Sequence, residues 1–236
     1  MPAVPTPLQI CYLPAQWRVL EGPRLRDSAC VVIDVIRATS TIVSALAHGA
    51  AGVQPIADSA DAFVQKALNP DALLAGERHG RALPGFDLGN SPEDYTEAQV
   101  KGRHIILTTT NGTPALEACR GARAVMTGCL LNLDAVALQL LELGPPWTIV
   151  CAGHEGGFGI DDAIVAGALA EALDQPHAFV SLYRAVKSDL PGALLRSWAG
   201  RQLVRVGVEK DVEFCAKLNV FPLVPTLGSD GILRVS

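Results

Sequence analysis

The sequence lacks the features that would place it in a membrane or on a nucleic acid. No stretch reaches the ~18 uncharged apolar residues that a membrane-spanning helix needs. Residues 1–7 are rich in proline but hold no Lys or Arg, so they do not resemble a signal peptide. No basic tract occurs, and 24 acidic against 19 basic residues leave a net charge of −5, which argues against nucleic acid or an anionic membrane as partner.

The 6 cysteines lack the spacing of a metal or redox site. No C-x-x-C pair is present, and several of the cysteines lie within apolar runs. Buried free thiols in a reducing compartment explain this spacing. We therefore expect a cytoplasmic protein without disulfides, and a chain of 236 residues can bury a sufficient core without them.

Short β-branched runs alternate with longer runs of helical period along most of the chain. Residues 30–34 form an apolar run closed by an acid, which is typical of a strand covered on both faces. The alternation predicts a layered α/β/α fold with a mainly parallel sheet. Strands are expected at 30–34, 52–57, 72–76, 104–109, 123–127 and 147–152, and helices at 39–48, 59–68, 113–119, 131–143 and 161–173.

The last quarter of the chain has a different pattern. Residues 178–218 are expected to be a helical C-terminal portion, followed by short strands at 219–224 and 232–235. No linker or composition shift marks a boundary, so we expect residues 1–236 to form a single α/β unit. A division into two subdomains stays open.

Polar residues gather where the predicted strands give way to helices, which is where open α/β sheets bind ligands. At the first such junction Asp34 closes a strand, and Arg37, Thr39 and Ser40 begin the next helix. A helix start offers free N–H groups, and an arginine can add a bidentate contact, so the junction suits an anion. The alternative is ordinary capping by Thr39 or Ser40, with an arginine–aspartate pair.

A second junction follows the strand at 104–109. Thr109, Thr110, Asn111, Gly112 and Thr113 combine hydroxyls with a glycine turn, which resembles an anion-binding cradle. The alternative is a threonine-rich strand end that needs only a turn and a capping threonine.

Two further junctions contribute acidic residues. After Cys151 a glycine-rich segment leads to Asp161 and Asp162, and adjacent carboxylates favour a hard metal ion. The alternative is that both acids merely stabilise a helix start. Glu77 and Arg78 end another strand, and the loop after them, residues 85–92 with Asn90, is either part of the site or only the approach to a helix that begins at Pro92.

Most known catalytic signatures are missing. The chain has no D-x-D motif at Asp34, no arginine six residues after Cys151, no Walker motif, no dinucleotide fingerprint and no zinc-protease motif. Arg78-His79-Gly80 matches the R-H-G of histidine phosphatases, but only over three residues. The function of the site must therefore be inferred from the strand-to-helix junctions and from their order along the chain.

The junction motifs are Asp34-Val-Ile-Arg-Ala-Thr-Ser-Thr, Gly76-Glu-Arg, Gly85-Phe-Asp-Leu-Gly-Asn-Ser-Pro, Thr108-Thr-Thr-Asn-Gly-Thr and Cys151-Ala-Gly, followed by Asp161-Asp162 with Ala166-Gly167, and Val212-Glu-Phe-Cys215. In this order they resemble the 2-phosphosulfolactate phosphatase family, from about residue 10 onward. The resemblance implies a Mg²⁺-dependent phosphatase that hydrolyses 2-phospho-3-sulfolactate to 3-sulfolactate and phosphate, as in coenzyme M biosynthesis.

The residue types fit that class of chemistry. Mg²⁺ prefers hard oxygen ligands and would position an attacking water; a covalent route through Asp34 or Cys151 is the alternative. We expect the metal ligands among Asp34, Glu77, Asp161 and Asp162, the catalytic residues among Asp34, Arg37, Glu77 and Cys151, and the substrate-binding residues among Arg37, Thr39, Ser40, Arg78, Asn90, Thr109, Thr110, Asn111, Gly112 and Thr113.

The expected partner is a small anionic phosphoester, and a homodimer is left open. Two other functions compete with the one implied by the resemblance. One is a phosphatase of another small phosphorylated hydroxy-acid, and the other is a non-catalytic anion-binding protein.

Overall fold

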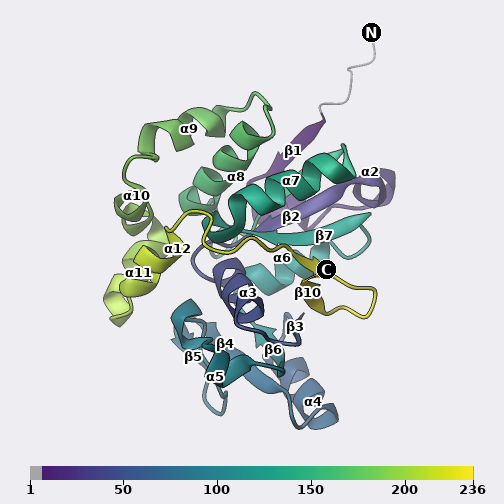
Figure 1. The fold of residues 1–236 in the computed structure, drawn as a ribbon, viewed down its shortest axis with the longest axis vertical. Coiled ribbons are helices and arrows are strands. Elements are labelled where there is room, and N and C mark those ends of the chain that lie inside the picture. The colour runs from purple at the N-terminus through teal and green to yellow at the C-terminus, as the bar shows by residue number, and fades with distance from the viewer. Residues whose placement is uncertain (1–6, 236) are drawn as a thin grey trace.

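The structure is a computed structural model that describes residues 7–235. Strands from this part of the chain form one 10-stranded sheet. Its strand order is β1-β8-β2-β7-β9-β10-β3-β6-β4-β5 (Figure 1). The bounds are β1 (Leu8–Cys11), β2 (Ala29–Ile33), β3 (Gly52–Pro55), β4 (Leu73–Arg78), β5 (Arg81–Ala82), β6 (His104–Thr108), β7 (Ala124–Gly128), β8 (Trp147–Cys151), β9 (Pro225–Leu227) and β10 (Leu233–Val235).

The sheet consists of two parallel blocks joined by an antiparallel hairpin. In the first block β1, β8, β2 and β7 pair in parallel, and in the second β3, β6 and β4 do so. The hairpin β9–β10 lies between them, pairing Met126 with Thr226 on one side and Val53 with Leu233 on the other. The first block occupies the upper half of Figure 1 and the second the lower half.

Helices pack on both blocks of the sheet, and they cover both faces of the first block. Their bounds are α1 (Pro14–Trp17), α2 (Gly22–Asp27), α3 (Ala38–Ala47), α4 (Ser59–Leu68), α5 (Glu97–Val100), α6 (Gly112–Ala118), α7 (Leu133–Leu143), α8 (Ile160–Ala172), α9 (Ala178–Val186), α10 (Leu190–Arg196), α11 (Trp198–Val206) and α12 (Lys210–Cys215). None of the helices that the structure describes is long and apolar enough to cross a membrane.

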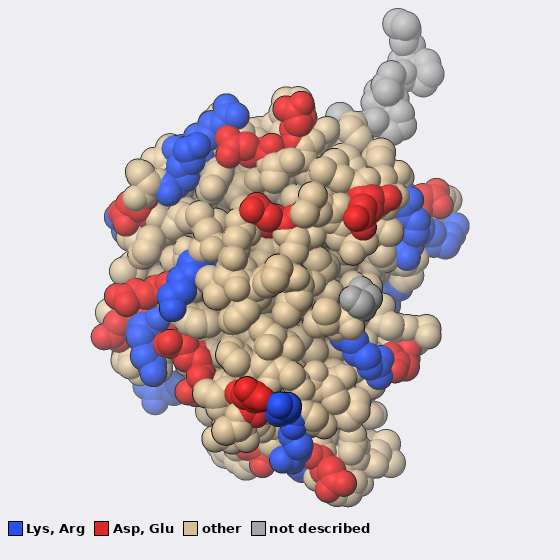
Figure 2. Space-filling model, viewed as in Figure 1, with Lys and Arg blue, Asp and Glu red and all other residues tan. Residues whose placement is uncertain are grey.

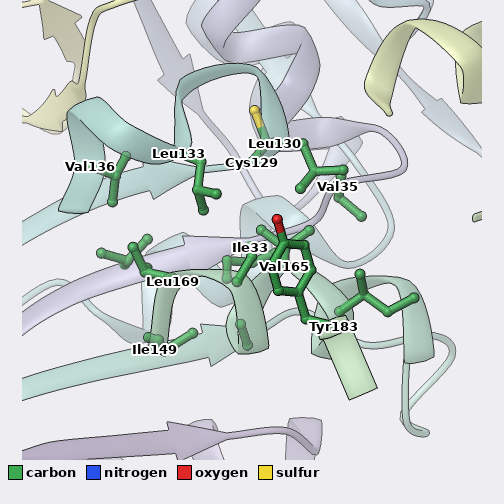
Figure 3. Packing of buried hydrophobic residues seen from close by; sticks show 14 of the residues in the cluster. Ile33, Val35, Cys129, Leu130, Leu133, Val136, Ile149, Val165, Leu169 and Tyr183 are labelled. Carbon is green, nitrogen blue, oxygen red and sulfur yellow. The ribbon is translucent and has the colours of Figure 1, made fainter. Parts of the chain in front are cut away.

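The core lies on the two faces of β2, whose five residues are all buried. Val31 and Ile33 pack with side chains of α7 and α8 on one face (Figure 3). Cys30 and Val32 pack on the other face with side chains of α3 and α6. Because side chains alternate along a strand, a continuous apolar run needs cover on both sides. The layered α/β fold with a mainly parallel sheet and a helical C-terminal portion is thus confirmed.

Some of the predicted local structure is wrong. Residues 219–224 form no strand, because Asn219 has a left-handed backbone (φ 53°) and the N–H groups of Asn219 and Phe221 bond to the carbonyls of Leu130 and Leu131. Residues 92–94 form only a 3₁₀ turn instead of starting a longer helix. Strands β1 and β5 and helices α1 and α2 were not predicted from the sequence. The prediction that residues 1–7 are not a signal peptide concerns a segment of which residues 1–6 lie outside the described part of the chain.

Charged side chains of both signs are interspersed on the face that Figure 2 shows. All 6 cysteines are free and buried.

Candidate active site

A cavity that is partly open to solvent, with about 520 Å³ of empty space when its open mouth is included, lies where β2, β4 and β6 give way to the segments that follow them. Polar groups of these junctions line one side, and α11 of the C-terminal portion lines another. The lining residues are Asp34, Ile36, Arg37, Glu77, His79, Gly80, Asn90, Thr110, Asn111, His154, Glu155, Trp198, Ala199, Gln202 and Leu203. Of the residues predicted for the site, Asp34, Arg37, Glu77, Asn90, Thr110 and Asn111 therefore share one cavity.

Asp34 is the most perturbed acid of the cavity wall. Its Oδ1 accepts a hydrogen bond from the backbone N–H of Ala38 at 3.2 Å, and its Oδ2 has no hydrogen-bond donor among the described residues. Burial, followed by the charge of Glu77, raises its pKa to about 7. A Cβ at Gly112 would lie 2.8 Å from this Oδ2, so glycine at 112 allows α6 to approach the carboxylate closely.

Glu77 connects β4 to the turn after β6. Its Oε1 accepts hydrogen bonds from both the backbone N–H and the hydroxyl of Thr110, each at 2.9 Å, and its Oε2 accepts one from the backbone N–H of Gly80 at 2.8 Å. These contacts fix the cavity wall formed by the second block of the sheet.

Arg37 is held by a buried acid from the C-terminal portion. Its Nη1 lies 2.6 Å from Asp211 Oδ2, and its Nη2 donates to the carbonyl of Gly80 at 2.8 Å. The sequence left open an arginine–aspartate pair at this junction. The pair exists, but its acid comes from α12.

Asn90 supplies a second unpaired oxygen. Its side chain lies in the cavity wall, is 4% exposed, and its Oδ1 is buried without a hydrogen-bond partner among residues 7–235. A buried acceptor without a donor is costly, so this oxygen is suited to a cation or a donor group of a bound ligand.

Asp161 and Asp162 lie at the start of α8 and do not line the cavity. Asp162 accepts hydrogen bonds from the backbone N–H groups of Val35 and Gly153, each at 3.0 Å, and so ties two junctions together. Its pKa is raised well above the usual range by burial and by the charges of Asp161 and Asp34. Burial also raises the pKa of Asp161 to about 6. Among the described residues no three His, Cys, Asp or Glu side chains are grouped as a metal site.

Several residues expected to bind substrate instead brace the junctions. Thr39 and Ser40 donate their hydroxyls to the carbonyls of Asp34 and Val35, at 2.9 and 2.8 Å. Thr109 and Thr113 bond to each other's backbone N–H groups at 3.1 Å. None of these four hydroxyl residues lines the cavity, and neither does Gly112. Thr39, Ser40 and Thr113 do not act as caps either, because they lie inside α3 and α6, whose N-cap residues are Arg37 and Asn111.

Arg78 and Cys151 are also outside the cavity wall. Arg78 donates to the carbonyls of Glu77 and Ala57 and to the hydroxyl of Thr108. Cys151 is fully buried, and its pKa is raised well above the usual range by burial and by the charges of Asp162 and Asp161. A buried protonated thiol is a poor nucleophile, so we withdraw the covalent route through Cys151.

The sequence analysis missed the far wall of the cavity. The ring of His154 stacks on that of Trp198 with centroids 3.2 Å apart, and burial lowers its pKa. His79 and Glu155 both have left-handed backbones (φ 53° and 46°), with Nδ1 and Oε1 3.9 Å apart. The glycine-rich stretch around His154 was a usable signal, but nothing in the sequence indicated that α11 would face it.

The fold and the cavity together define an α/β enzyme whose site sits at strand ends. A family model described as 2-phosphosulpholactate phosphatase matches residues 18–230. The chain therefore belongs to the 2-phosphosulfolactate phosphatase family, a family of phosphatases, as the ordered motifs indicated.

Proteins similar to this chain include three with the same name. One from Caldanaerobacter subterraneus subsp. tengcongensis is 40% identical over 223 residues, covering 90% of this chain and 92% of the relative. One from Symbiobacterium thermophilum is 42% identical over 213 residues, covering 85% and 91%. One from a Synechococcus strain is 42% identical over 229 residues, covering 90% and 94%. Each is named "Probable 2-phosphosulfolactate phosphatase".

Proposed function

We propose that this protein hydrolyses 2-phospho-3-sulfolactate to 3-sulfolactate and phosphate with the help of Mg²⁺. The observation that carries the proposal is that two side-chain oxygens of residues lining one cavity, Asp34 Oδ2 and Asn90 Oδ1, have no hydrogen-bond donor among residues 7–235. The family membership and the three named relatives support the substrate.

These oxygens fit a magnesium ion. Mg²⁺ is bound through one or two protein oxygens together with waters and substrate phosphates, so a group of three acidic ligands is not required. Asp34 and Asn90 would hold the ion, with the charge of Glu77 close by. When bound, Mg²⁺ would neutralise charge on the phosphoryl group and position a water. Asp161 and Asp162 are left out of the ligand set because they do not line the cavity.

The other residues of the cavity would bind and shield the substrate. Arg37 can donate to an anion with the N–H groups that its two protein contacts leave free. Thr110 and Asn111 line the cavity beside Glu77. Trp198 and Leu203 on α11 would keep bulk water from the reacting phosphate.

A second candidate is a phosphatase of another small phosphorylated hydroxy-acid. The wall formed by Ile36, Trp198, Ala199 and Leu203 favours it, because phospho-3-sulfolactate carries three anionic groups and no apolar part that would pack there. An anion-binding protein without catalysis is the third alternative from the sequence.

One experiment separates these functions. Phosphate release from a panel of phosphoesters, including 2-phospho-3-sulfolactate and phospholactates with apolar side chains, is measured with Mg²⁺ and with a chelator. Mg²⁺-dependent turnover of the sulfonate ester supports the proposal, and turnover of apolar esters alone supports the second candidate. Full activity in the presence of the chelator would contradict the proposed Mg²⁺ requirement. The absence of phosphate release from every ester would contradict both phosphatase functions.

Asp34→Asn tests the reacting centre. It preserves the shape and the contact with Ala38 while removing the charge, so turnover should fall by several orders of magnitude in a folded protein. Asp58→Asn is the matched control, since Asp58 is an exposed helix cap that accepts from Ala60. Wild-type turnover by Asp34→Asn would remove Asp34 from the site.

We also propose that the enzyme works in the cytoplasm, where its 6 free cysteines would stay reduced, and that it supplies sulfolactate to coenzyme M biosynthesis.

A further inference from the structure

Asp211 connects three segments that are far apart in the sequence. It is fully buried on α12. Its Oδ2 accepts from Arg37 Nη1 at 2.6 Å, and its Oδ1 accepts from the hydroxyl of Ser91 at 2.5 Å. One carboxylate thereby fixes the β2–α3 junction and the loop after Asn90 to the C-terminal helices.

Asp211 itself does not line the cavity, whereas its partner Arg37 does. The Arg37 guanidinium is held from two sides, by Asp211 and by the carbonyl of Gly80. An arginine has five N–H donors in a rigid plane, so fixing two of them fixes the direction of the remaining three before an anion arrives. A fixed donor costs less entropy on binding than a mobile side chain.

We propose that Asp211 is a positioning residue for substrate binding, which acts by holding Arg37 in the geometry that receives an anionic group of the phosphoester. The inference rests on the proposed function, and it makes the C-terminal helices a part of the binding machinery. A purely structural ion pair would contribute to stability without affecting substrate affinity.

The variant Asp211→Asn keeps the shape of the side chain and removes its charge. We expect KM for the phosphoester to rise about 10- to 100-fold while kcat stays within about threefold, since an ion pair is exchanged for a hydrogen bond to a neutral amide, which holds the guanidinium less firmly. The dissociation constant of inorganic phosphate, measured by calorimetry, should rise in parallel. Asp189→Asn, an exposed cap on α10 that accepts from Gly192, is the control and should change neither quantity.

A double-mutant cycle with Arg37→Met separates positioning from general stability. If Asp211 acts through Arg37, Asp211→Asn should cause no further loss of kcat/KM when Arg37 is already methionine. The double variant should also melt higher than Arg37→Met alone, because the single change leaves a buried carboxylate unpaired. If Asp211→Asn does not fold, Ser91→Ala provides the same test with a smaller rise in KM, because it frees Asp211 Oδ1 without burying a charge.

Two results would overturn the inference: unchanged KM and phosphate affinity in a folded Asp211→Asn protein, or losses of kcat/KM that add in the double variant. Either would leave the phosphatase function standing if the wild type still releases phosphate. If the wild type binds phosphate but hydrolyses no ester, the proposed function fails, and the phosphate measurement still decides the role of Asp211. A wild type that neither hydrolyses esters nor binds phosphate would overturn both.

Discussion

The raised pKa of Asp34 predicts that this side chain destabilises the metal-free protein at neutral pH. In the folded chain its pKa is about 7, against 3.8 for an ordinary aspartate. Between pH 3.8 and about pH 7, the folded protein therefore keeps a proton on Asp34 that the unfolded chain has released. The free energy of unfolding falls as pH rises through this range. One pKa unit corresponds to about 1.4 kcal/mol, so the cost is about 2 kcal/mol at pH 5 and about 4 kcal/mol at pH 8.

Asp34→Asn removes this cost while keeping an oxygen for the N–H of Ala38. Without metal, the free energy of unfolding of the variant should therefore exceed that of the wild type by about 4 kcal/mol at pH 8 and by about half of that at pH 5. For a domain of this size 4 kcal/mol corresponds to a Tm difference of about 8–16 °C. The assay is urea and thermal unfolding of both proteins at the two pH values, with Asp58→Asn as the control.

Adding Mg²⁺ should reduce the difference. An ion that binds only the folded wild type stabilises it by mass action, whereas the asparagine variant lacks the charge that attracts the ion. Two results would contradict a raised pKa at Asp34: an Asp34→Asn variant no more stable than the wild type at pH 8, or a gain in the free energy of unfolding that is the same at pH 5 and pH 8.

Three further predictions concern single side chains. Arg37→Lys should lower kcat/KM by an amount that corresponds to about 1.5–3 kcal/mol of transition-state stabilisation, the range for hydrogen bonds to charged groups, because one ammonium cannot keep both protein contacts and bind an anion. Steady-state kinetics that give an unchanged kcat/KM would show that Arg37 only pairs with a buried acid. Cys151→Ala should keep kcat/KM within about twofold, because the buried thiol takes no part in the reaction, and a large loss with an unchanged melting temperature would restore the covalent route. Gly112→Ala should lower activity at least tenfold, because its Cβ would lie 2.6 Å from Ala38 Cβ and 2.8 Å from Asp34 Oδ2, so that the carboxylate and the start of α3 must shift. Gly89→Ala, whose Cβ would be 3.4 Å from its nearest neighbour, is the matched control, and equal activity of the two variants would contradict this explanation.

The alternation of strands and helices was predictable because it depends on local patterns of apolar residues. The buried strand at β2 and the helix at α4 followed directly from such patterns. The sheet order was not predictable in the same way. Strands β9 and β10 are short and pair with segments far away in the sequence, and such pairing is set by tertiary packing.

The candidate site was predicted only in part, for a physical reason. Asp34 and Glu77 stand at strand ends, and that position alone brought them to the cavity. Hydroxyl residues such as Thr39 and Thr113 satisfy either an anion or the backbone, and a sequence does not show which of these partners wins. The partner of Arg37 could not be found, because Asp211 lies 174 positions away on a helix with no motif of its own.

The hairpin between the two parallel blocks has a consequence for the order of folding. Leu233 of β10 pairs with Val53 of β3, and these two residues lie farther apart in sequence than any pair within a block, including Leu8 with Trp147. Contacts this distant in sequence form late, because loop closure costs entropy before the pairing can offset it. We therefore expect the second block to collapse separately and to expose the edge of β3 until it joins the hairpin. During that interval, unpaired strands of this kind can pair with other chains, so refolding yield should fall as protein concentration rises.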